Sequence, residues 1–463
     1  MQKHSSGALI NDLTQGPLAR QLITFALPFI GANILQVAYN IVDMAVVGHF
    51  VGSGGLSAVS IGGQIIYLLN CLSVGASNGG QVLVAQIVGS GNLDRLKKCI
   101  GTIFSVLFIA AAAATLLGFF ALDASLDMMN TPPEAYAGAR SYLAISVAGL
   151  IFTYGYNAVC SILRGMGDSK RPLIFILIAS LVNLVLDFVF VGGFGMGTAG
   201  AALATVISQA CSFLFAIAYL YRRREGFHFD FRLRSFRIDG EMAALYAKLG
   251  LPMALQYIAI NFSVLYCNSR VNAYGVVASA TGGIGYKLFS VTTIISSSIQ
   301  VASTSIIGQN IASGNIRRCK KTVFIGWGFA LAAAMIFSGV CLLAPRAIFG
   351  IFNNEPEVLA MAPVYLRIAV VGYIADALMN PPLALMYGVG AVAFNFAVAM
   401  LDGVVARIGL SLLFGKLFGL TGYWLGSSCA AYVTVIFASI YFFSGAWKKR
   451  RLLSHAEEQQ DSL

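Results

Sequence analysis

The chain has 463 residues, of which 58% are hydrophobic and only 11% are charged, and its mean hydropathy is +0.79. A single water-soluble core cannot hide that much apolar surface, so the composition excludes a soluble globular protein and indicates a protein of the lipid bilayer. The net charge of +11 comes from basic residues at the ends of apolar segments. This placement favours contact with anionic lipid head groups and argues against nucleic acid as a partner.

Apolar segments long enough to cross a membrane occur along the whole chain. About 20 such residues span the bilayer core as a helix, and the sequence holds twelve segments of this kind. They lie at about 21–46, 57–88, 99–122, 138–162, 172–192, 197–221, 245–269, 277–308, 321–344, 361–387, 391–414 and 419–446. The first is too long for a cleaved signal peptide, so we expect it to be the first span. The predicted fold is an all-α polytopic membrane protein with twelve transmembrane helices.

A constant shift of 223 positions lays the first half of the chain on the second. The matched residues are Gln86/Gln309, Ser90-Gly91-Asn92/Ser313-Gly314-Asn315, Lys97-Lys98/Lys320-Lys321, Asn130/Asn353, Pro133-Glu134/Pro356-Glu357, Tyr142-Leu143/Tyr365-Leu366, Asn157/Asn380 and Gly165/Gly388. This repeat predicts two pseudo-symmetric six-helix lobes, 1–222 and 245–447, with a polar cytoplasmic linker at 223–244 and a cytoplasmic tail at 448–463. Such duplication is typical of transporters that rock two halves around a shared cavity.

Lys and Arg are distributed unevenly between the two sides of the predicted spans. With the N-terminus inside, 23 of the 30 fall in cytoplasmic segments, five fall outside, and Lys287 and Arg407 lie within spans. Because short positively charged loops stay in the cytoplasm, both termini are predicted to be cytoplasmic, and the two lobes to point the same way. We expect a multi-pass protein of the plasma membrane of a prokaryote, acting as a monomer.

Cysteine and histidine give no sign of a metal centre or of catalysis. The eight Cys residues form no C-x-x-C pair, and the four His residues lie near span ends or in loops, with no H-E-x-x-H motif. We therefore expect no enzyme activity and no cofactor.

Proline occupies matching places early in the first span of each lobe. Pro28 and Pro252 each free a backbone carbonyl and favour a bend in the helix. Pro28 is therefore a candidate hinge, although a static kink explains it as well.

Four carboxylates lie inside predicted spans, where burial is costly and the side chain usually faces a cavity. They are Asp43, Asp187, Asp376 and Asp402. None has an acidic counterpart in the other lobe: Asp187 corresponds to Leu410, Asp376 to Thr153, Asp402 to Ala179, and Asp43, after a one-residue gap, to Tyr266 or Cys267. The architecture is thus repeated, whereas the ionisable groups are not.

Depth in the membrane brings two of these acids together. At about 1.5 Å per residue, Asp43 lies roughly 34 Å and Asp187 roughly 24 Å along helices that start at the cytoplasmic face, so both fall in the outer part of the bilayer. Two spans that run the other way bring Tyr142 and Thr205 to a similar depth, and Asn183 is one helical turn from Asp187. We expect these five residues to converge as an ion-coupling site.

The chemistry of this set fits either of two coupling ions. The oxygens of Asp43, Asn183, Asp187 and Thr205 suit a hard cation such as Na⁺, and a desolvated carboxyl group can equally exchange protons. The sequence does not separate H⁺ from Na⁺. Two structural alternatives remain: Asn183 and Thr205 can form hydrogen bonds between helices, and Asp43 can cap a helix end near water.

Other polar residues within the first lobe are candidates for a substrate cavity. Gln36, Asn40 and Asp43 follow one another at i, i+4 and i+7 on the first span, and Asn157 adds polarity to the fourth. Ordinary hydrogen bonding between helices explains this stripe equally well.

Asp376 and Asp402 extend the candidate substrate cavity into the second lobe, since both lie near the middle of the membrane. For Asp402 a buried ion pair with Arg407 or Lys287 would be a purely structural explanation.

At these residues the chain resembles the multidrug and toxic compound extrusion (MATE) family. The stretch LPFIGANILQVAYNIVDMAVVGHFVG (27–52) is similar to the family's first span with its acid, and ILRGMGDSKRP (162–172) to its loop between spans 4 and 5. Asn183 and Asp187 resemble the proton- or sodium-linked site of prokaryotic members, to which Asp43, Tyr142 and Thr205 also correspond. The segment 245–270 carries no acid, unlike branches with a glutamate in span 7, which makes the DinF-like branch the closer match.

The resemblance implies a V-shaped pair of six-helix lobes and a cation-coupled antiporter that exports bulky, cationic or amphipathic drugs or toxic metabolites. Asp376 stands where other members also place a span-10 carboxylate. The alternative function is a lipid-linked precursor flippase of the same superfamily, which would need a cationic cavity, and few basic residues lie within the spans. The substrate cannot be identified from the sequence, because adaptable apolar side chains define a drug cavity.

Overall fold

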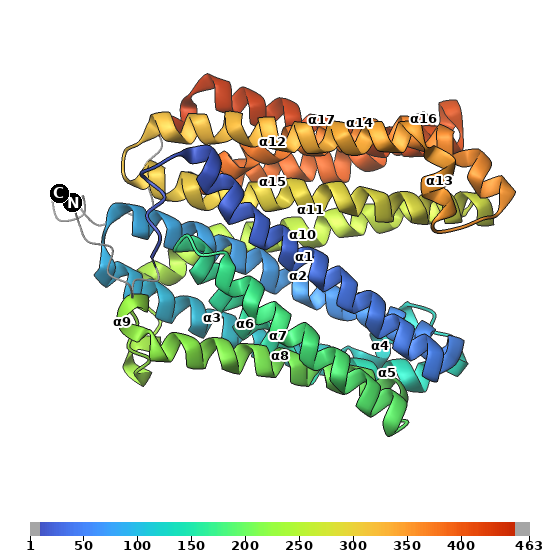
Figure 1. Ribbon diagram of the computed structural model, residues 1–463, viewed down its shortest axis with the longest axis horizontal. Coiled ribbons are helices and arrows are strands. Elements are labelled where there is room, and N and C mark those ends of the chain that lie inside the picture. Colours follow the sequence, from blue (N-terminus) through green and yellow to red (C-terminus); the bar gives the residue numbers. More distant parts are fainter. Residues whose placement is uncertain (1–9, 450–463) are drawn as a thin grey trace. The chain divides into compact units, whose positions relative to one another are not determined.

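The computed structural model describes residues 10–449, and within this range the chain is built of helices (Figure 1). Eleven of the described helices are long and apolar enough to cross a membrane, and one bent pair of helices makes a twelfth span. The predicted all-α protein with twelve spans is therefore confirmed. Lys3 and the part of the predicted tail beyond Lys449 lie outside the described residues.

The first half of the chain contains six spans and several short helices. They are α1 (Leu18–Phe50), α2 (Gly52–Ser90), α3 (Leu93–Phe120), α4 (Leu122–Met128), α5 (Pro133–Ala148), α6 (Leu150–Gly165), α7 (Lys170–Asp187), the π-helix η1 (Phe188–Gly193), α8 (Gly197–Arg222), α9 (Arg224–Phe227) and the 3₁₀-helix η2 (Leu233–Phe236).

The second half repeats the six spans with a similar set of helices. They are α10 (Gly240–Asn272), α11 (Val276–Ala312), α12 (Ile316–Leu343), α13 (Pro345–Gly350), α14 (Pro356–Gly388), α15 (Val392–Met400), the π-helix η3 (Leu401–Ala406), α16 (Arg407–Phe418), α17 (Leu420–Ser444) and the 3₁₀-helix η4 (Ala446–Lys449).

The repeated turn Ser-Gly-Asn joins the second and third spans in both halves for the same reason. Gly91 and Gly314 follow the ends of α2 and α11 with φ of 75° and 77°, a left-handed conformation that glycine adopts without steric cost. The side chain of the next residue, Asn92 or Asn315, accepts a hydrogen bond from the backbone N–H three positions later and so caps the following helix. This local chemistry explains why the motif recurs.

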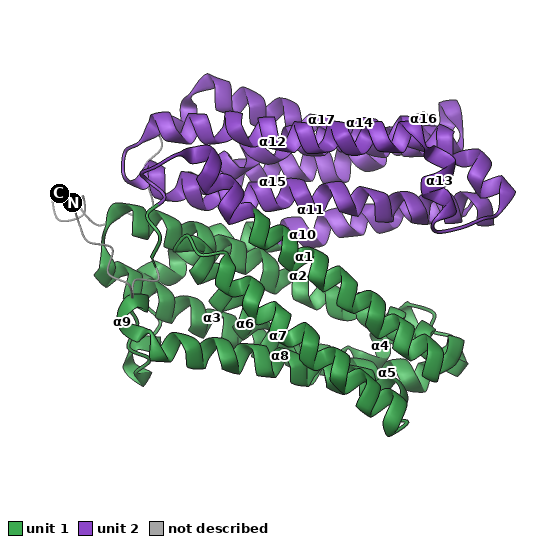
Figure 2. Cartoon of the chain, viewed as in Figure 1, with its two compact units in different colours: residues 1–12, 27–254 green, residues 13–26, 255–463 purple. Residues whose placement is uncertain are grey.

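Contacts divide the chain into two compact units (Figure 2). Unit 1 contains the chain up to Asp12 and Leu27–Ala254, and unit 2 contains Leu13–Ala26 and the chain from Leu255 onward. The assignment changes inside α1 and inside α10, next to Pro28 and Pro252. The start of each of these helices thus belongs to a different unit from its end, a feature that the repeat does not reveal. The lobe boundaries of the repeat itself stay predictions.

Packing explains both changes of unit. Leu18, Leu22 and Phe25 at the start of α1 are buried in one apolar cluster with Ile306 of α11 and Ala334 of α12, all in unit 2. This cluster holds the first two turns of α1 in unit 2.

The start of α10 packs closely on α2 within unit 1. A Cβ atom added to Gly75 would lie 2.3 Å from the Cα of Ala254, and one added to Gly79 would lie 2.6 Å from the Cα of Gly250. Such close backbone approach is possible only where small residues meet.

The fourth span of unit 1 is broken, although the sequence predicts one continuous span at 138–162. It consists of α5 and α6, which meet at Gly149 with a bend of 47°. A Cβ atom at Gly149 would lie 2.4 Å from Val206 Cγ2 of α8, so the glycine lets α8 approach the bend. The corresponding span of unit 2, α14, passes its matching Gly372 as one helix.

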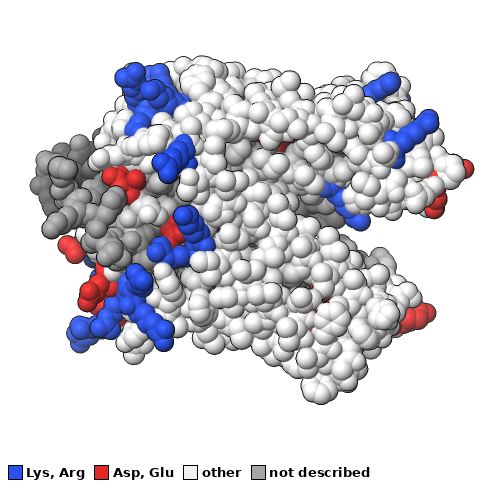
Figure 3. Space-filling view, viewed as in Figure 1, with Lys and Arg blue, Asp and Glu red and all other residues white. Residues whose placement is uncertain are grey.

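Charged side chains gather near the helix ends in each unit (Figure 3). On the face shown, the surface between the ends carries almost none. Among the described residues the ion pairs of the linker region stay within unit 1: Arg95 with Glu241, Lys97 with Asp230, and Lys98 with Asp239. This distribution suits helices whose middle parts lie in hydrocarbon.

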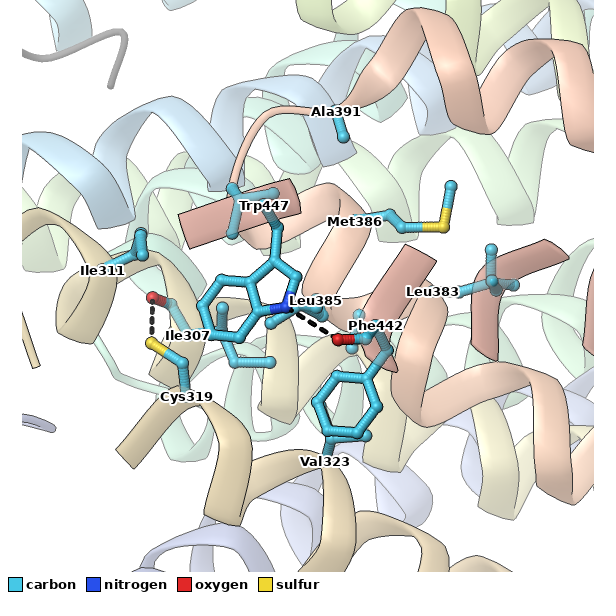
Figure 4. Close-up of a cluster of buried hydrophobic side chains, with 13 residues drawn as sticks. Ile307, Ile311, Cys319, Val323, Leu383, Leu385, Met386, Ala391, Phe442 and Trp447 are labelled. Atoms are coloured by element: carbon cyan, nitrogen blue, oxygen red, sulfur yellow. Dashed lines mark hydrogen bonds between the residues drawn. The ribbon is translucent and has the colours of Figure 1, made fainter. Parts of the chain in front are cut away.

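The described chain ends in a packed position in unit 2. Trp447 of η4 is fully buried, and its indole Nε1 donates a hydrogen bond of 3.0 Å to the carbonyl of Phe442 (Figure 4). Its neighbours in the cluster include Ile307 of α11 and Leu385 of α14. The first residues after the last span are therefore anchored to the unit.

Candidate functional site

Asp43 and Asp187 form the centre of a polar site inside unit 1. Asp43 lies in α1 and is 8% exposed, and Asp187 is the last residue of α7 and is 1% exposed. Their carboxyl groups are close enough to influence each other electrostatically. Because a carboxylate only accepts hydrogen bonds, a bond between the two groups requires that one of them carry a proton.

Three of the four carboxyl oxygens of this pair have no hydrogen-bond partner in the described chain. They are Asp43 Oδ1 and both oxygens of Asp187. Buried polar atoms are nearly always hydrogen-bonded in folded proteins. An unpartnered pair of buried carboxyl groups therefore fits a site that takes up a proton or a cation.

Tyr142 covers this pair from α5. It is 8% exposed and packs in an apolar cluster with Val46 and Val47 of α1 and Val191 of η1. Room for the ring comes from Gly62 of α2, where an added Cβ atom would lie 2.7 Å from Tyr142 Cδ1. The apolar cluster excludes water from one side of the acids and so increases the cost of charging them.

Asn183 and Thr205 complete the predicted set. Asn183 is buried on α7, one turn before Asp187, and its Nδ2 lies 3.5 Å from the hydroxyl oxygen of Thr205 on α8. The Thr205 hydroxyl donates a bond of 3.0 Å to the carbonyl of Ala201. The contact between Asn183 and Thr205 is the interhelical hydrogen bond of the structural alternative. The two contacts still leave the amide oxygen of Asn183 and a lone pair of Thr205 for a cation.

A π-helical segment follows Asp187 directly. η1 runs from Phe188 to Gly193, so the regular α-helix ends at the carboxylate. π-helical turns occur frequently at functional sites, because the extra residue per turn changes the direction of the neighbouring side chains.

The ligand set suits a hard monovalent cation better than a transition metal. No group of three or more His, Cys, Asp and Glu side chains in the described chain could hold a metal ion. Two carboxylates, an amide and a hydroxyl supply oxygen ligands only, which suit Na⁺.

The residues of the predicted polar stripe on α1 differ in their exposure. Asp43 is buried, whereas Gln36 and Asn40 are exposed on the helix. Asn157 of α6 donates a hydrogen bond of 3.0 Å from its Nδ2 to the hydroxyl of Ser73 on α2. For Asn157 the structure therefore contains the bond between helices that the alternative explanation requires, and the substrate role of these residues stays a prediction.

Asp376 lies beside Asn380 in unit 2, and Asn380 is the repeat partner of Asn157. Asn380 donates from its Nδ2 to Asp376 Oδ1 at 3.2 Å, and Ser296 of α11 lies close to the carboxylate. Ser296 and Asn380 are the repeat partners of Ser73 and Asn157. Asp376 is 2% exposed, and its Oδ2 has no partner in the described chain. The serine of this pair carries no sequence signal beyond the repeat itself.

Asp402 lies in the π-helix η3 and is 7% exposed. Its Oδ2 accepts a hydrogen bond of 2.6 Å from the hydroxyl of Thr434 on α17. The positive charge of Arg407 interacts electrostatically with this carboxylate. Lys287, the other candidate for neutralising this acid, places its Nζ 5.6 Å from the ring centre of Phe352 instead.

Comparisons of sequence identify relatives over nearly the whole chain. The MatE family model matches residues 28–189 and 252–413, one match in each half. The chain is 28% identical over 454 residues to the probable multidrug resistance protein YpnP of Bacillus subtilis, covering 96% of this chain and 99% of the relative. It is 25% identical over 452 residues to the probable multidrug resistance protein NorM of Thermotoga maritima, covering 94% and 95%.

Solved structures with the same fold include a MOP superfamily transporter from Pyrococcus furiosus. That structure has a TM-score of 0.88 at 21% identity and covers 97% of this chain and all of its own. The MATE transporter VcmN of Vibrio cholerae has a TM-score of 0.87 at 17% identity and covers 94% of this chain and 98% of its own. These similarities confirm the predicted MATE-like fold, whereas the assignment to a DinF-like branch stays a prediction. With the family model matched in both halves, the chain belongs to the MatE family of multidrug efflux transporters.

Proposed function

We propose that the protein is a secondary active transporter that exports bulky cationic or amphipathic compounds in exchange for H⁺ or Na⁺ by alternating access. The observation that carries this proposal is the buried pair of Asp43 and Asp187, whose carboxyl groups influence each other electrostatically and of whose four oxygens three have no hydrogen-bond partner in the described chain. Asn183 and Thr205 supply further oxygen ligands, and Tyr142 closes the site against water.

Electrostatics explains why such a pair responds to ions. Two like charges about 4 Å apart repel by about 4 kcal/mol at the effective dielectric constant of a protein, and burial in a membrane adds to the cost of each charge. A bound proton or Na⁺ removes most of this cost. An ion that enters from outside can therefore favour one conformation, provided that its affinity differs between conformations.

Helix α1 can connect the ion site to a larger motion. Asp43 lies in the part of α1 that belongs to unit 1, whereas the residues before Leu27 belong to unit 2. Pro28 stands beside the change of unit and cannot donate the backbone hydrogen bond that would stiffen the helix there. In this proposal, ion binding at Asp43 shifts α1 about Pro28 and favours release of the substrate to the exterior.

The substrate in this proposal is a small molecule. The residues proposed to contact it are Gln36, Asn40 and Asn157 in unit 1 and, considered separately, Asp376 and Asp402 in unit 2. The protein acts as a monomer in the cytoplasmic membrane of a prokaryote, with both termini in the cytoplasm, and requires no cofactor. The uneven distribution of Lys and Arg, with 23 of 30 in the predicted cytoplasmic segments, supports this orientation.

The test is efflux by the purified protein in liposomes under separately imposed proton and sodium gradients. Asp43→Asn and Asp187→Asn should each abolish transport driven by the gradient that the wild type uses, because an amide neither exchanges protons nor supplies charge to Na⁺. Asp123→Asn is the matched control, since Asp123 is an exposed acid paired with Arg140. Unimpaired gradient-driven transport by both site variants would exclude this mechanism.

A further inference from the structure

A cavity of about 160 Å³ lies inside unit 2, among α10, α11, α14, α16 and α17. Six of the eighteen described residues that line it are aromatic, and Arg407 is the only charged one among them. The aromatic residues are Tyr286, Phe289, Tyr365, Tyr373, Tyr423 and Trp424. Tyr365 and Trp424 meet edge to face, with ring centres 5.0 Å apart. This cavity plays no part in the coupling mechanism proposed above.

The cavity occupies the place in unit 2 that the carboxylate site occupies in unit 1. The two family matches, 28–189 and 252–413, differ by 224 positions. At this shift Asp43 corresponds to Cys267, Asp187 to Ser411 and Asn183 to Arg407. Cys267 and Arg407 line the cavity. Tyr365, which is the partner of Tyr142 at the shift of 223, also lines it.

A direct contact supports this equivalence. Cys267 Sγ lies 3.8 Å from Ser411 Oγ, so the counterparts of the two acids are in contact. Asp187 therefore matches Ser411, and the match to Leu410 expected from a shift of 223 is wrong by one residue. The tyrosine is held in the same way in both units: a Cβ atom at Gly285, the partner of Gly62, would lie 2.0 Å from the Tyr365 ring.

Charge is reversed between the two equivalent places. Unit 1 has two acids, and unit 2 has one cation with a thiol and a hydroxyl. Arg407 forms none of the ion pairs found in the described chain. The nearby Asp402 does not line the cavity, and one of its oxygens is occupied by Thr434.

Hydrogen-bond donors in the cavity wall lack acceptors. Buried Nε of Arg407, Nε1 of Trp424 and the hydroxyl of Tyr373 have no hydrogen-bond partner in the described chain. Arginine and indole N–H groups only donate, so the group that completes them must bring acceptor oxygens. A carboxylate supplies two such oxygens and matches the planar guanidinium.

The volume sets the size of the remaining part of the ligand. A cavity of about 150 Å³ accommodates one benzene molecule, and the cavity volume of about 160 Å³ is close to this value. Aromatic walls favour a flat ring, which can contact the faces and edges of Trp424 and Tyr365.

We propose that the cavity around Arg407 and Trp424 is a binding site for a single-ring aromatic carboxylate, with its carboxylate on Arg407 and its ring against the aromatic wall. This proposal concerns binding in unit 2 and is independent of the ion coupling proposed for Asp43 and Asp187.

The first test uses ligands of one shape and different charge. Benzoate, benzyl alcohol and benzylamine are titrated into the purified full-length protein in nanodiscs by calorimetry. Benzoate should bind at least about tenfold more tightly than benzylamine, because a charge-assisted hydrogen bond is roughly twice as strong as a neutral one and the cation would face Arg407. Equal or tighter binding of benzylamine would overturn the proposal.

The second test changes the cation. Arg407→Gln should weaken benzoate binding at least about tenfold while leaving benzyl alcohol nearly unchanged, and Arg407→Lys should retain part of the affinity. Lys287→Gln is the matched control, because Lys287 is a cation within a span that does not line the cavity. Unchanged benzoate affinity in Arg407→Gln would overturn the proposal. If this variant fails to fold, the conservative Arg407→Lys and the ligand series on the wild type still decide the matter.

The position of the ligand is checked with 4-iodobenzoate. Its iodine should be located within unit 2 beside Trp424, by anomalous diffraction or by electron microscopy of the complex. Saturated protein with the iodine at any other place would overturn the assignment of this cavity.

Discussion

Unit 1 and unit 2 share their packing but differ in their chemistry. In unit 1 Tyr142 packs on Gly62, and in unit 2 Tyr365 packs on Gly285 in the same way. The fifth span of each unit contains a π-helical segment next to a carboxylate, η1 after Asp187 and η3 around Asp402. Around these common elements one unit carries two facing acids and the other carries an arginine. The comparison shows that small residues and helix geometry can be retained while the charge of the site changes.

In both units an arginine binds the start of the first helix of a repeat, or the segment just before it. We call each of these contacts an arginine clamp. Arg95 and Arg318 are repeat partners at the start of α3 and α12. Arg95 forms an ion pair with Glu241 at the start of α10. Arg318 donates hydrogen bonds to the carbonyls of Gly16, at 2.8 Å, and Leu13, at 3.2 Å, just before α1. Each arginine thus binds the beginning of a helix, α10 or α1, whose later part belongs to the other unit.

The largest effect is expected when unit 1 receives the residues of unit 2. The double change Asp43→Cys with Asp187→Ser should abolish ion-driven transport in liposomes, because neither new side chain carries charge at neutral pH or binds Na⁺ as a carboxylate does. The control is Cys267→Ser with Ser411→Ala, which alters the equivalent pair in unit 2. Equal loss of ion coupling in both double variants would contradict the assignment of ion coupling to unit 1.

The next largest effect is expected at the clamp on α1. Arg318→Ala should lower the free energy of local opening at 13–21 by at least about 2 kcal/mol, since hydrogen bonds to a charged group contribute about 1.5–3 kcal/mol. Amide hydrogen exchange of this segment measures the change. The neighbouring Arg317 is exposed, so Arg317→Ala should leave exchange unaltered. Slow exchange that persists in Arg318→Ala would show that the apolar cluster alone holds the segment.

The glycines under the two tyrosines should respond by smaller amounts. Gly285→Ala and Gly62→Ala should each destabilise the protein by about 1–3 kcal/mol, because overpacking forces neighbours to shift. Gly285 should be more sensitive, because its added Cβ atom would lie 2.0 Å from Tyr365, compared with 2.7 Å from Tyr142 at Gly62.

Adjacent glycines supply the controls for these variants. Gly283 and Gly63 have no neighbour within 4 Å of an added Cβ atom, so alanine there should be neutral or slightly stabilising in a helix. Thermal unfolding in detergent measures all four variants, and an equal response of Gly283 and Gly285 would contradict the packing argument.

The smallest effect concerns pH and belongs to unit 1 alone. Hydrogen bonds from Lys97 and Ser235 hold the pKa of Asp230 well below its ordinary value of 3.8. A carboxyl group with a lowered pKa stabilises the fold above that ordinary value, and the stabilisation disappears as the pH falls toward the lowered pKa. Because the pair is solvent-exposed, the contribution should stay below about 1 kcal/mol.

Asp230→Asn tests this pH dependence. The difference in melting temperature between the wild type and the variant should be present at pH 7 and should narrow as the pH is lowered from about 4. A difference that grows on acidification would contradict the sign of this argument. Asp94→Asn serves as a control, since none of the ion pairs of the described chain involves Asp94.

Much of the candidate site was predictable because helices convert position in sequence into depth. The rise per residue placed Asp43 and Asp187 in the outer part of the membrane, and in the structure the two buried carboxyl groups are close enough to influence each other electrostatically. The helical period likewise placed Asn183 on the face of Asp187. Exposure along α1 was not predictable in this way, since Gln36 and Asn40 share a stripe with Asp43 but not its burial.

The sequence by itself determined the number and approximate positions of the spans, the repeat, and the residues that are costly to bury, because these depend on local hydrophobicity and spacing. Only the tertiary structure decided the break at Gly149, the change of unit within α1 and α10, and the meeting of Arg407, Cys267 and Trp424 around one cavity. These features depend on which helices pack together. Such contacts join residues far apart in the chain, and no local pattern encodes them.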